Sequence, residues 1–198
     1  MMLVELGTIA AADLPIAEFG AHLRLGTGFS DDGSEDALLE ACLRAAMAAI
    51  EARTGKALMT RRFSWQLTGW RDARAQVLPV APVSAITALK IVDAAGVASL
   101  VPAGDYELQK DAQCPRLIAP GGRLPMVPEG GSAEVEFDAG FGPAWADLPV
   151  DLAQAVFLLA AHYFDNRGSA GGQEDLLPFG VLALIEAYRN VRVLGGGA

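Results

Sequence analysis

The chain has 198 residues, 52% of them hydrophobic, and its 24 acidic and 15 basic residues give a net charge of −9. This composition excludes a disordered chain, and the charge argues against a protein that grips nucleic acid, because such proteins gain most of their affinity from Lys and Arg on phosphates. Since there is no run of eighteen uninterrupted apolar residues, we expect a soluble globular protein.

The first helices are predicted within residues 1–60. One runs from about Asp13 to Leu25, with Pro15 early in its first turn. A longer helix follows an acidic loop: Ser34 is suited to cap it, its apolar residues recur at spacings of three and four, and Gly55 is suited to end it. Both helices are amphipathic, so each needs a partner to cover its apolar side.

The pattern changes from helical to alternating after residue 59. Phe63, Trp65 and Leu67 alternate with polar residues, which predicts a half-buried strand. Further strands are predicted over 77–80, 86–92, 97–101, 106–109, 116–118 and 132–138. The second and third of these form a hairpin around the turn at 93–96, and the Pro- and Gly-rich segment 119–131 is predicted to be a loop.

The strongest helical pattern lies at 148–167. Pro149 suits a first helical position, two apolar stripes run along the segment, and Gly168 is suited to end it. We expect this helix to pack on the helix that ends at Gly55. The predicted core between them consists of Leu39, Leu43, Ile50, Leu152, Val156, Leu159 and Tyr163.

Helices at both ends and short strands in the middle predict an α+β fold, a helical bundle core with an inserted antiparallel β domain. The predicted helical core comprises 1–60 and 147–198, including a C-terminal docking helix, and the inserted β-rich domain comprises 61–142. This segregation of helices from strands disfavours a parallel sheet and the nucleotide-binding folds built on it.

Residues suited to catalysis are few. His22 and His162 each lie in an amphipathic helix without a partner at ligand spacing, and no nucleophile elbow, His-Glu-x-x-His pair or phosphate-binding loop is present. Cys42 and Cys114 share no metal-ligand spacing and are expected to be reduced. We therefore predict no enzyme, no catalytic residue, no metal and no cofactor.

Two acidic groups allow a second interpretation. Asp31, Asp32 and Asp36 have the chemistry to ligate a divalent cation, but capping and helix-dipole stabilisation account for them. Three carboxylates alternate along 134–138, which indicates a solvated strand face or, less simply, half of a catalytic pair.

The order of these elements resembles one known family. Residues 16–25 and 36–58 resemble the paired N-terminal helices of the tailed-phage head-tail connector proteins. The resemblance continues in 78–93, in 135–142 and in the sequence Leu-Leu-Ala-Ala-His-Tyr-Phe-Asp-Asn-Arg that ends at Arg167. A composition rich in Ala, Gly and Arg with few Lys also fits the connector of a gene transfer agent, a domesticated phage-like particle.

The resemblance implies a non-enzymatic adaptor, with the middle strands inserted on the helical core of the family. Its subunits form a ring, commonly of about twelve, between the portal protein and a tail-side stopper or tail terminator protein. DNA passes through the ring without specific binding, and an acidic surface suits such a conduit. The N-terminus lacks the features of a signal peptide, so we expect assembly in the bacterial cytoplasm, without a membrane partner, and a final location in the particle neck.

The final helix, predicted over 178–192, carries more apolar residues than one core-facing stripe needs. It either packs on its own bundle or docks on the portal, and the resemblance favours docking. The predicted portal-docking residues are Phe179, Leu182, Ile185, Tyr188, Val191, Val193 and Leu194.

Two other functions remain open from the sequence. One is a tail-completion or other virion protein of related shape. The other is an enzyme or small-molecule binder whose β domain forms a pocket, although no catalytic constellation supports it.

Overall fold

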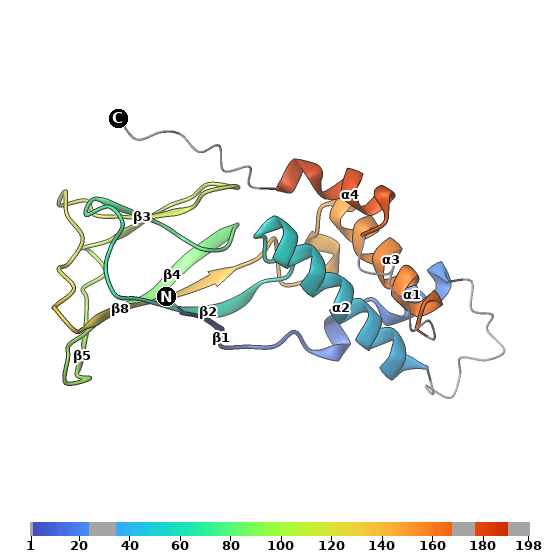
Figure 1. The fold of residues 1–198 in the computed structure, drawn as a ribbon, viewed down its shortest axis with the longest axis horizontal. Helices are drawn as coiled ribbons and strands as arrows, with labels where there is room; N and C mark the ends of the chain where they lie inside the picture. The colour runs from blue at the N-terminus through green and yellow to red at the C-terminus, as the bar shows by residue number, and fades with distance from the viewer. Residues whose placement is uncertain (1, 24–34, 168–176, 190–198) are drawn as a thin grey trace. The chain divides into compact units, whose positions relative to one another are not determined.

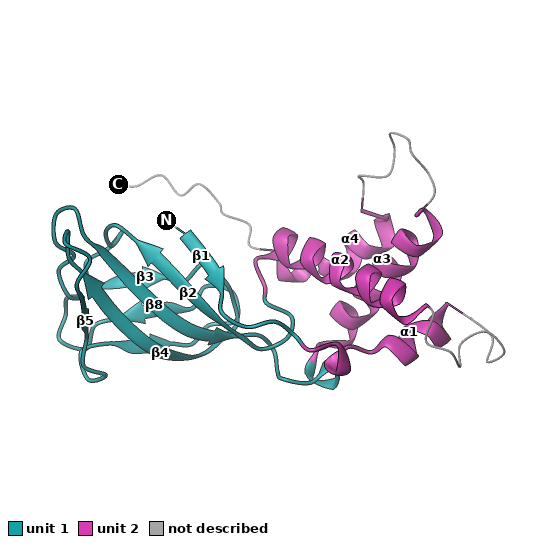
Figure 2. Ribbon diagram, turned by 90° about the horizontal axis from the view of Figure 1, so that it is seen from below, with its two compact units in different colours: residues 1–9, 57–147 teal, residues 10–56, 148–198 magenta. Residues whose placement is uncertain are grey.

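The computed structural model describes residues 2–23, 35–167 and 177–189. The chain divides into two compact units, residues 1–9 with 57–147 and residues 10–56 with 148–198 (Figure 2). All strands of the described residues lie in the first unit and all α-helices in the second. The α+β fold predicted from the sequence is therefore confirmed. We call the two parts the strand unit and the helical unit.

The helical unit is built around two long helices (Figure 1). Its elements are η1 (Ala11–Asp13), α1 (Ile16–His22), α2 (Asp36–Thr54), α3 (Val150–Asp165), α4 (Phe179–Ile185) and η3 (Glu186–Tyr188). α2 packs against both α1 and α3, and α3 also packs against α4. Among the described helices, none is both long enough and apolar enough to span a bilayer.

The helix ends follow local chemistry. Gly55 ends α2 in the left-handed conformation, with φ of 69°, and its N–H donates to the carbonyl of Glu51, as predicted. α1 begins after Pro15, later than the predicted start at Asp13, which lies in η1 instead. The final helix is also shorter than predicted: α4 ends at Ile185 and tightens into the 3-10 turn η3, a common ending for a helix.

Six of the seven predicted core residues are at most 4% exposed: Leu39, Leu43, Ile50, Leu152, Val156 and Leu159. Tyr163 is only half-buried, and its placement in the core is wrong. The buried stripe of α3 continues from Ala160 to Phe164, four residues on, so the ring of Phe164 takes the inward position and Tyr163 lies beside it.

The strand unit contains two antiparallel sheets. The five-stranded sheet has the order β1-β2-β8-β4-β5 and the three-stranded sheet the order β3-β7-β6. The strands are β1 (Met2–Glu5), β2 (Arg61–Leu67), β3 (Ala75–Val77), β4 (Val83–Val92), β5 (Ala98–Leu100), β6 (Glu107–Gln109), β7 (Arg116–Ile118) and β8 (Ser132–Ala139), and the 3-10 turn η2 (Trp145–Asp147) follows. The predicted hairpin is the β4–β5 pair.

Alternation along β2 builds the core of the strand unit. Phe63, Trp65 and Leu67 are buried while the residues between them are not. Phe63 lies opposite Phe137 of β8, and their rings stack with centroids 5.6 Å apart. Leu117 of β7 belongs to the same cluster and is fully buried. Both sheets therefore contribute to one apolar core.

β1 was not predicted. It pairs antiparallel with β2, so residues 1–9 belong to the strand unit and not to the helical part, where the sequence placed 1–60. Four residues are too few to show an alternating pattern, and the partner strand begins only at Arg61. The other boundaries of the strand unit, 57 and 147, lie a few residues outside the predicted 61–142.

Candidate functional site

α4 covers part of the helical core. Val181 and Ile185 are fully buried, whereas the Phe179 side chain is 86% exposed and Leu182 is half-buried. Ile185 was predicted as a portal-docking residue, and this prediction is corrected: Ile185 is a core residue of its own unit. Its spacing of four from Val181 forms the stripe that packs against α3.

Tyr188 is a second correction, because its hydroxyl is engaged inside the helical unit. It donates to both carboxylate oxygens of Asp151, at 2.8 and 3.0 Å. Asp151 lies in the first turn of α3, and one of its oxygens also accepts the N–H of Leu152. The bond ties the end of η3 to the start of α3, so Tyr188 is not free to dock on another protein.

Burial, and then the hydrogen bond and charge of Asp151, raise the pKa of Tyr188 to about 12. Unfolded tyrosine has a pKa of about 10. Because the pKa is higher in the folded state, the protonated Tyr188 hydroxyl contributes its full stabilisation below about pH 10. This contribution is lost as the pH rises through about 12. The wild-type protein should therefore lose stability over this window.

We expect Tyr188→Phe to lower the free energy of unfolding by about 1–2 kcal/mol at pH 8, because the Asp151 carboxylate loses a hydrogen-bond donor. Urea unfolding at pH 8 and pH 11, followed by circular dichroism, measures this. The difference between wild type and variant should shrink at pH 11. Tyr106→Phe in the strand unit is the control, and equal effects of the two variants would contradict the prediction.

Of the other predicted docking residues, Val191, Val193 and Leu194 lie outside the described residues. Phe179 and Leu182 remain as surface or partly exposed positions on α4. The Asp151–Tyr188 bond was missed by sequence reasoning, because the two residues are 37 positions apart and neither belongs to a recognisable motif.

The alternating carboxylates of β8 lie on one face of the five-stranded sheet, which we call the outer face. Asp138 forms an ion pair with Arg62 at 2.9 Å. Lys90 of β4 pairs with both Glu134 and Glu136. The hydrogen bond to Glu136 is the main cause that raises the pKa of Lys90. The carboxylates are thus partly neutralised, and each belongs to a cross-strand pair and not to a catalytic dyad.

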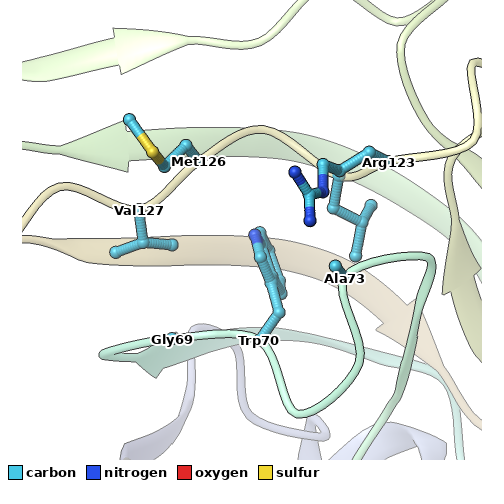
Figure 3. Close-up of a pocket in the computed structure, with 7 residues that line it drawn as sticks. Gly69, Trp70, Ala73, Arg123, Met126 and Val127 are labelled. Carbon is cyan, nitrogen blue, oxygen red and sulfur yellow. The ribbon is translucent and has the colours of Figure 1, made fainter.

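A cavity of about 370 Å³ lies in the strand unit (Figure 3). Its lining consists of Gly69, Trp70, Ala73, Arg123, Leu124, Met126 and Val127. The Trp70 indole points from its loop toward the segment that carries Arg123 and Val127, and its N–H donates to the carbonyl of Pro125 at 2.7 Å. Arg123 is the one ionisable side chain in this lining, so the cavity brings together no general acid and base.

The two histidines and Cys42 pack against residues of the helical unit, whereas Cys114 is exposed. The His22 ring packs against Phe157, with centroids 5.4 Å apart, and His162 lies against Asn166. Burial raises the pKa of the Cys42 thiol, an effect that the charge of Arg167 partly offsets. Within the described ranges, no three His, Cys, Asp or Glu side chains gather as a metal site; the acidic pair at 31–32 lies outside them.

In comparisons with known proteins, the sequence matches no protein-family model and no curated protein. Solved structures are similar over the whole chain. A chain in the neck of an empty gene transfer agent (GTA) particle, computed with C6 symmetry, is 56% identical over 99% of both chains, with a TM-score of 0.90. A chain in the virion of a native GTA particle is 56% identical over 99% of both chains, with a TM-score of 0.87. A chain in the neck of a native GTA particle, computed with C12 symmetry, is 51% identical over 99% of both chains, with a TM-score of 0.85.

These matches are not limited to one unit or one motif, because they span both chains almost from end to end. They confirm the family that the order of helices and strands indicated. The chain belongs to the head-tail connector proteins of tailed-phage-like particles and, among them, to the structural components of the gene transfer agent neck.

Proposed function

We propose that this protein is the connector subunit that joins the capsid of a gene transfer agent to its tail. The observation that carries the proposal is the 56% identity, over 99% of both chains, to a chain in the GTA neck. A protein of this kind acts by holding its neighbours in place, and its activity is binding and not catalysis. The cavity lined by apolar groups and one Arg offers no reason to prefer an enzyme.

The proposed assembly is a closed ring of twelve copies. Related chains lie in necks computed with C12 and with C6 symmetry, and a twelvefold ring satisfies both, because sixfold symmetry is contained in twelvefold symmetry. The ring would form in the bacterial cytoplasm, with the portal protein on one side and a stopper or tail terminator protein on the other.

DNA is proposed to pass through this ring without being held. The chain has a net charge of −9, and the phosphate backbone is repelled by a surface of the same sign. A polymer that must slide past the connector benefits from such repulsion, whereas a basic channel would retain it.

We propose that the C-terminal part of the chain docks on the portal. Ile185 and Tyr188 are left out of this surface, because both are engaged in the helical unit. Phe179 is a large apolar side chain left 86% exposed by the fold, and exposed apolar groups mark interaction surfaces. Val191, Val193 and Leu194 stay in the proposal on the strength of the sequence alone.

The test is co-sedimentation with the portal protein of the same particle. Wild type should join the portal, and Phe179→Ser combined with deletion of residues 190–198 should raise the Kd for the portal at least about tenfold, corresponding to about 1.4 kcal/mol. The deletion avoids Val181 and Ile185, so the helical core stays intact. Val150→Ser, which alters a different exposed apolar residue (85% exposed), is the control and should bind normally. Normal binding by the deletion variant would refute C-terminal docking, and failure of wild type to bind would refute the connector role.

A further inference from the structure

The first strand of the protein, together with Leu6, is a sheet edge with exposed apolar side chains, and its one charged residue, Glu5, is paired with Arg61 of its own subunit. Met2, Leu3, Val4 and Leu6 are 57, 41, 41 and 52% exposed. β1 is the terminal strand of the five-stranded sheet, with β5 at the opposite end (Figure 2). An exposed apolar edge strand is a template for pairing with another chain unless charge, proline or a covering segment protects it.

The hydrogen-bond pattern shows which main-chain groups of β1 point to the open side. The Leu6 N–H donates to the Arg62 carbonyl, so the main-chain N–H and carbonyl of Leu6 point toward β2. Because main-chain groups alternate in direction along an antiparallel strand, those of Leu3 and Glu5 point away from β2. The open edge therefore offers two N–H groups and two carbonyls.

The same reasoning applies to β5. The Val101 N–H donates to the Leu89 carbonyl, so the main-chain groups of Val101 point toward β4. Ala98 and Leu100 then point their main-chain groups away from β4. This edge is apolar as well, because Val97 and Leu100 are 60 and 70% exposed.

The two edges also match on the outer face. Val4 lies opposite Ser64, whose hydroxyl donates to Glu134 on that face. Leu100 lies opposite Lys90, which pairs with Glu136 on the same face. The outer face is thus charged in its centre and apolar at both ends. All neighbours in this five-stranded sheet are antiparallel, so β1 and β5 run in the same direction and continuing the sheet from one copy to the next gives a parallel pair. In that pair the main-chain groups of Leu100 bond to Leu3 and Glu5, and Val4 lies beside Leu100 on the outer face.

We propose that β1 of one copy pairs with β5 of the next copy, and that this strand pairing is a contact between neighbouring subunits of the ring. The inference rests on the ring in the proposed function. A ring of more than two copies needs two different, complementary surfaces on each subunit, and the two edges of one sheet meet this requirement. Strand addition supplies main-chain hydrogen bonds, and the apolar side chains supply the match. Both edges have only three or four residues, so each joint supplies few main-chain hydrogen bonds and depends also on the apolar side chains.

Cross-linking tests the proximity of the edges. In a Cys114→Ser background, which removes the exposed native thiol, a chain carrying both Val4→Cys and Leu100→Cys is treated with a short bis-maleimide. We expect a ladder of covalent multimers on a denaturing gel, from the isolated protein at high concentration and from the portal-bound assembly. Val4→Cys combined with Val150→Cys is the control and should give no ladder.

Proline variants test the strand pairing itself. Leu3→Pro and Leu100→Pro each remove an N–H that points to the open side, without removing a hydrogen bond of the subunit. Each variant should lose self-association in sedimentation experiments, while a 1:1 mixture should form dimers, because each partner supplies the edge that the other lacks. Val77→Pro is the matched control: Leu78 donates to Pro115, so the Val77 N–H points to the open side of the other sheet, and assembly should be unchanged.

The outcomes separate the two proposals. If wild type binds the portal but neither the ladder nor the proline effect is seen, the edge pairing is wrong and the connector role stands. If wild type does not bind the portal while the isolated protein gives the ladder, the connector role fails and the edge pairing stands. Absence of the ladder from both samples overturns the edge pairing in every case, and self-association by Leu100→Pro alone would replace it with a β1–β1 contact.

Discussion

Replacing Leu159 by alanine is expected to lower the free energy of unfolding of the helical unit by about 2–5 kcal/mol. Leu159 is 1% exposed in the middle of α3, which packs against both α2 and α4. The substitution removes buried methyl groups and leaves a cavity that long, mutually packed helices fill poorly. Urea unfolding followed by circular dichroism at 222 nm measures the change.

A control in the same helix separates burial from helix formation. Val150 lies at the start of α3 and is 85% exposed, so Val150→Ala should change the free energy of unfolding by no more than about 0.5 kcal/mol. Equal stability of the two variants would contradict the assignment of Leu159 to the core.

The second large effect is expected for Gly140→Ala, at about 3 kcal/mol or more. Gly140 follows β8 and has φ of 141°, a conformation that side chains disfavour. A Cβ atom there would lie 2.3 Å from the Thr60 nitrogen and 2.4 Å from the Met59 carbonyl carbon. These are main-chain atoms beside β2, so relieving the clash requires a shift of the strand itself. Soluble yield and the urea midpoint are the measurements.

Gly104→Ala provides the comparison. Gly104 does not have a left-handed φ, and a Cβ there would meet no atom within 4 Å, so the variant should be as stable as wild type within about 0.5 kcal/mol. If Gly140→Ala were equally harmless, the close contact between Gly140 and the main chain of Met59 and Thr60 would be wrong.

Sequence reasoning found the elements whose pattern is local. Apolar residues recur over several turns in α2 and α3, and they alternate with polar residues over several positions in β2 and β8. Such a pattern can be recognised from the segment itself, without knowing which element packs against it. β1 has four residues and depends on pairing with β2. Its position could not be predicted because the stabilising contacts lie far away in the sequence.

The functional surface was harder to predict than the fold. Apolar residues all round α4 were interpreted as an excess available for docking, but burial of Val181 and Ile185 against α3 accounts for part of that excess. The neighbouring helix determines which side of a short helix faces the core. The Tyr188–Asp151 hydrogen bond likewise depends on how η3 packs beside α3. The family, in contrast, was recognisable because it depends on the order of all the elements together.

The division of the chain has a consequence for synthesis on the ribosome. Residues 57–147 lie between α2 and α3, so every segment of the strand unit emerges before α3, the main partner of α2, has been made. The strand unit can fold while the apolar side of α2 is still uncovered, since domains generally fold as units during translation. A chain broken off before α3 would therefore carry a finished sheet and an exposed helix. Quality-control proteases and chaperones would recognise that helix, and incomplete subunits would be removed before they could enter a particle.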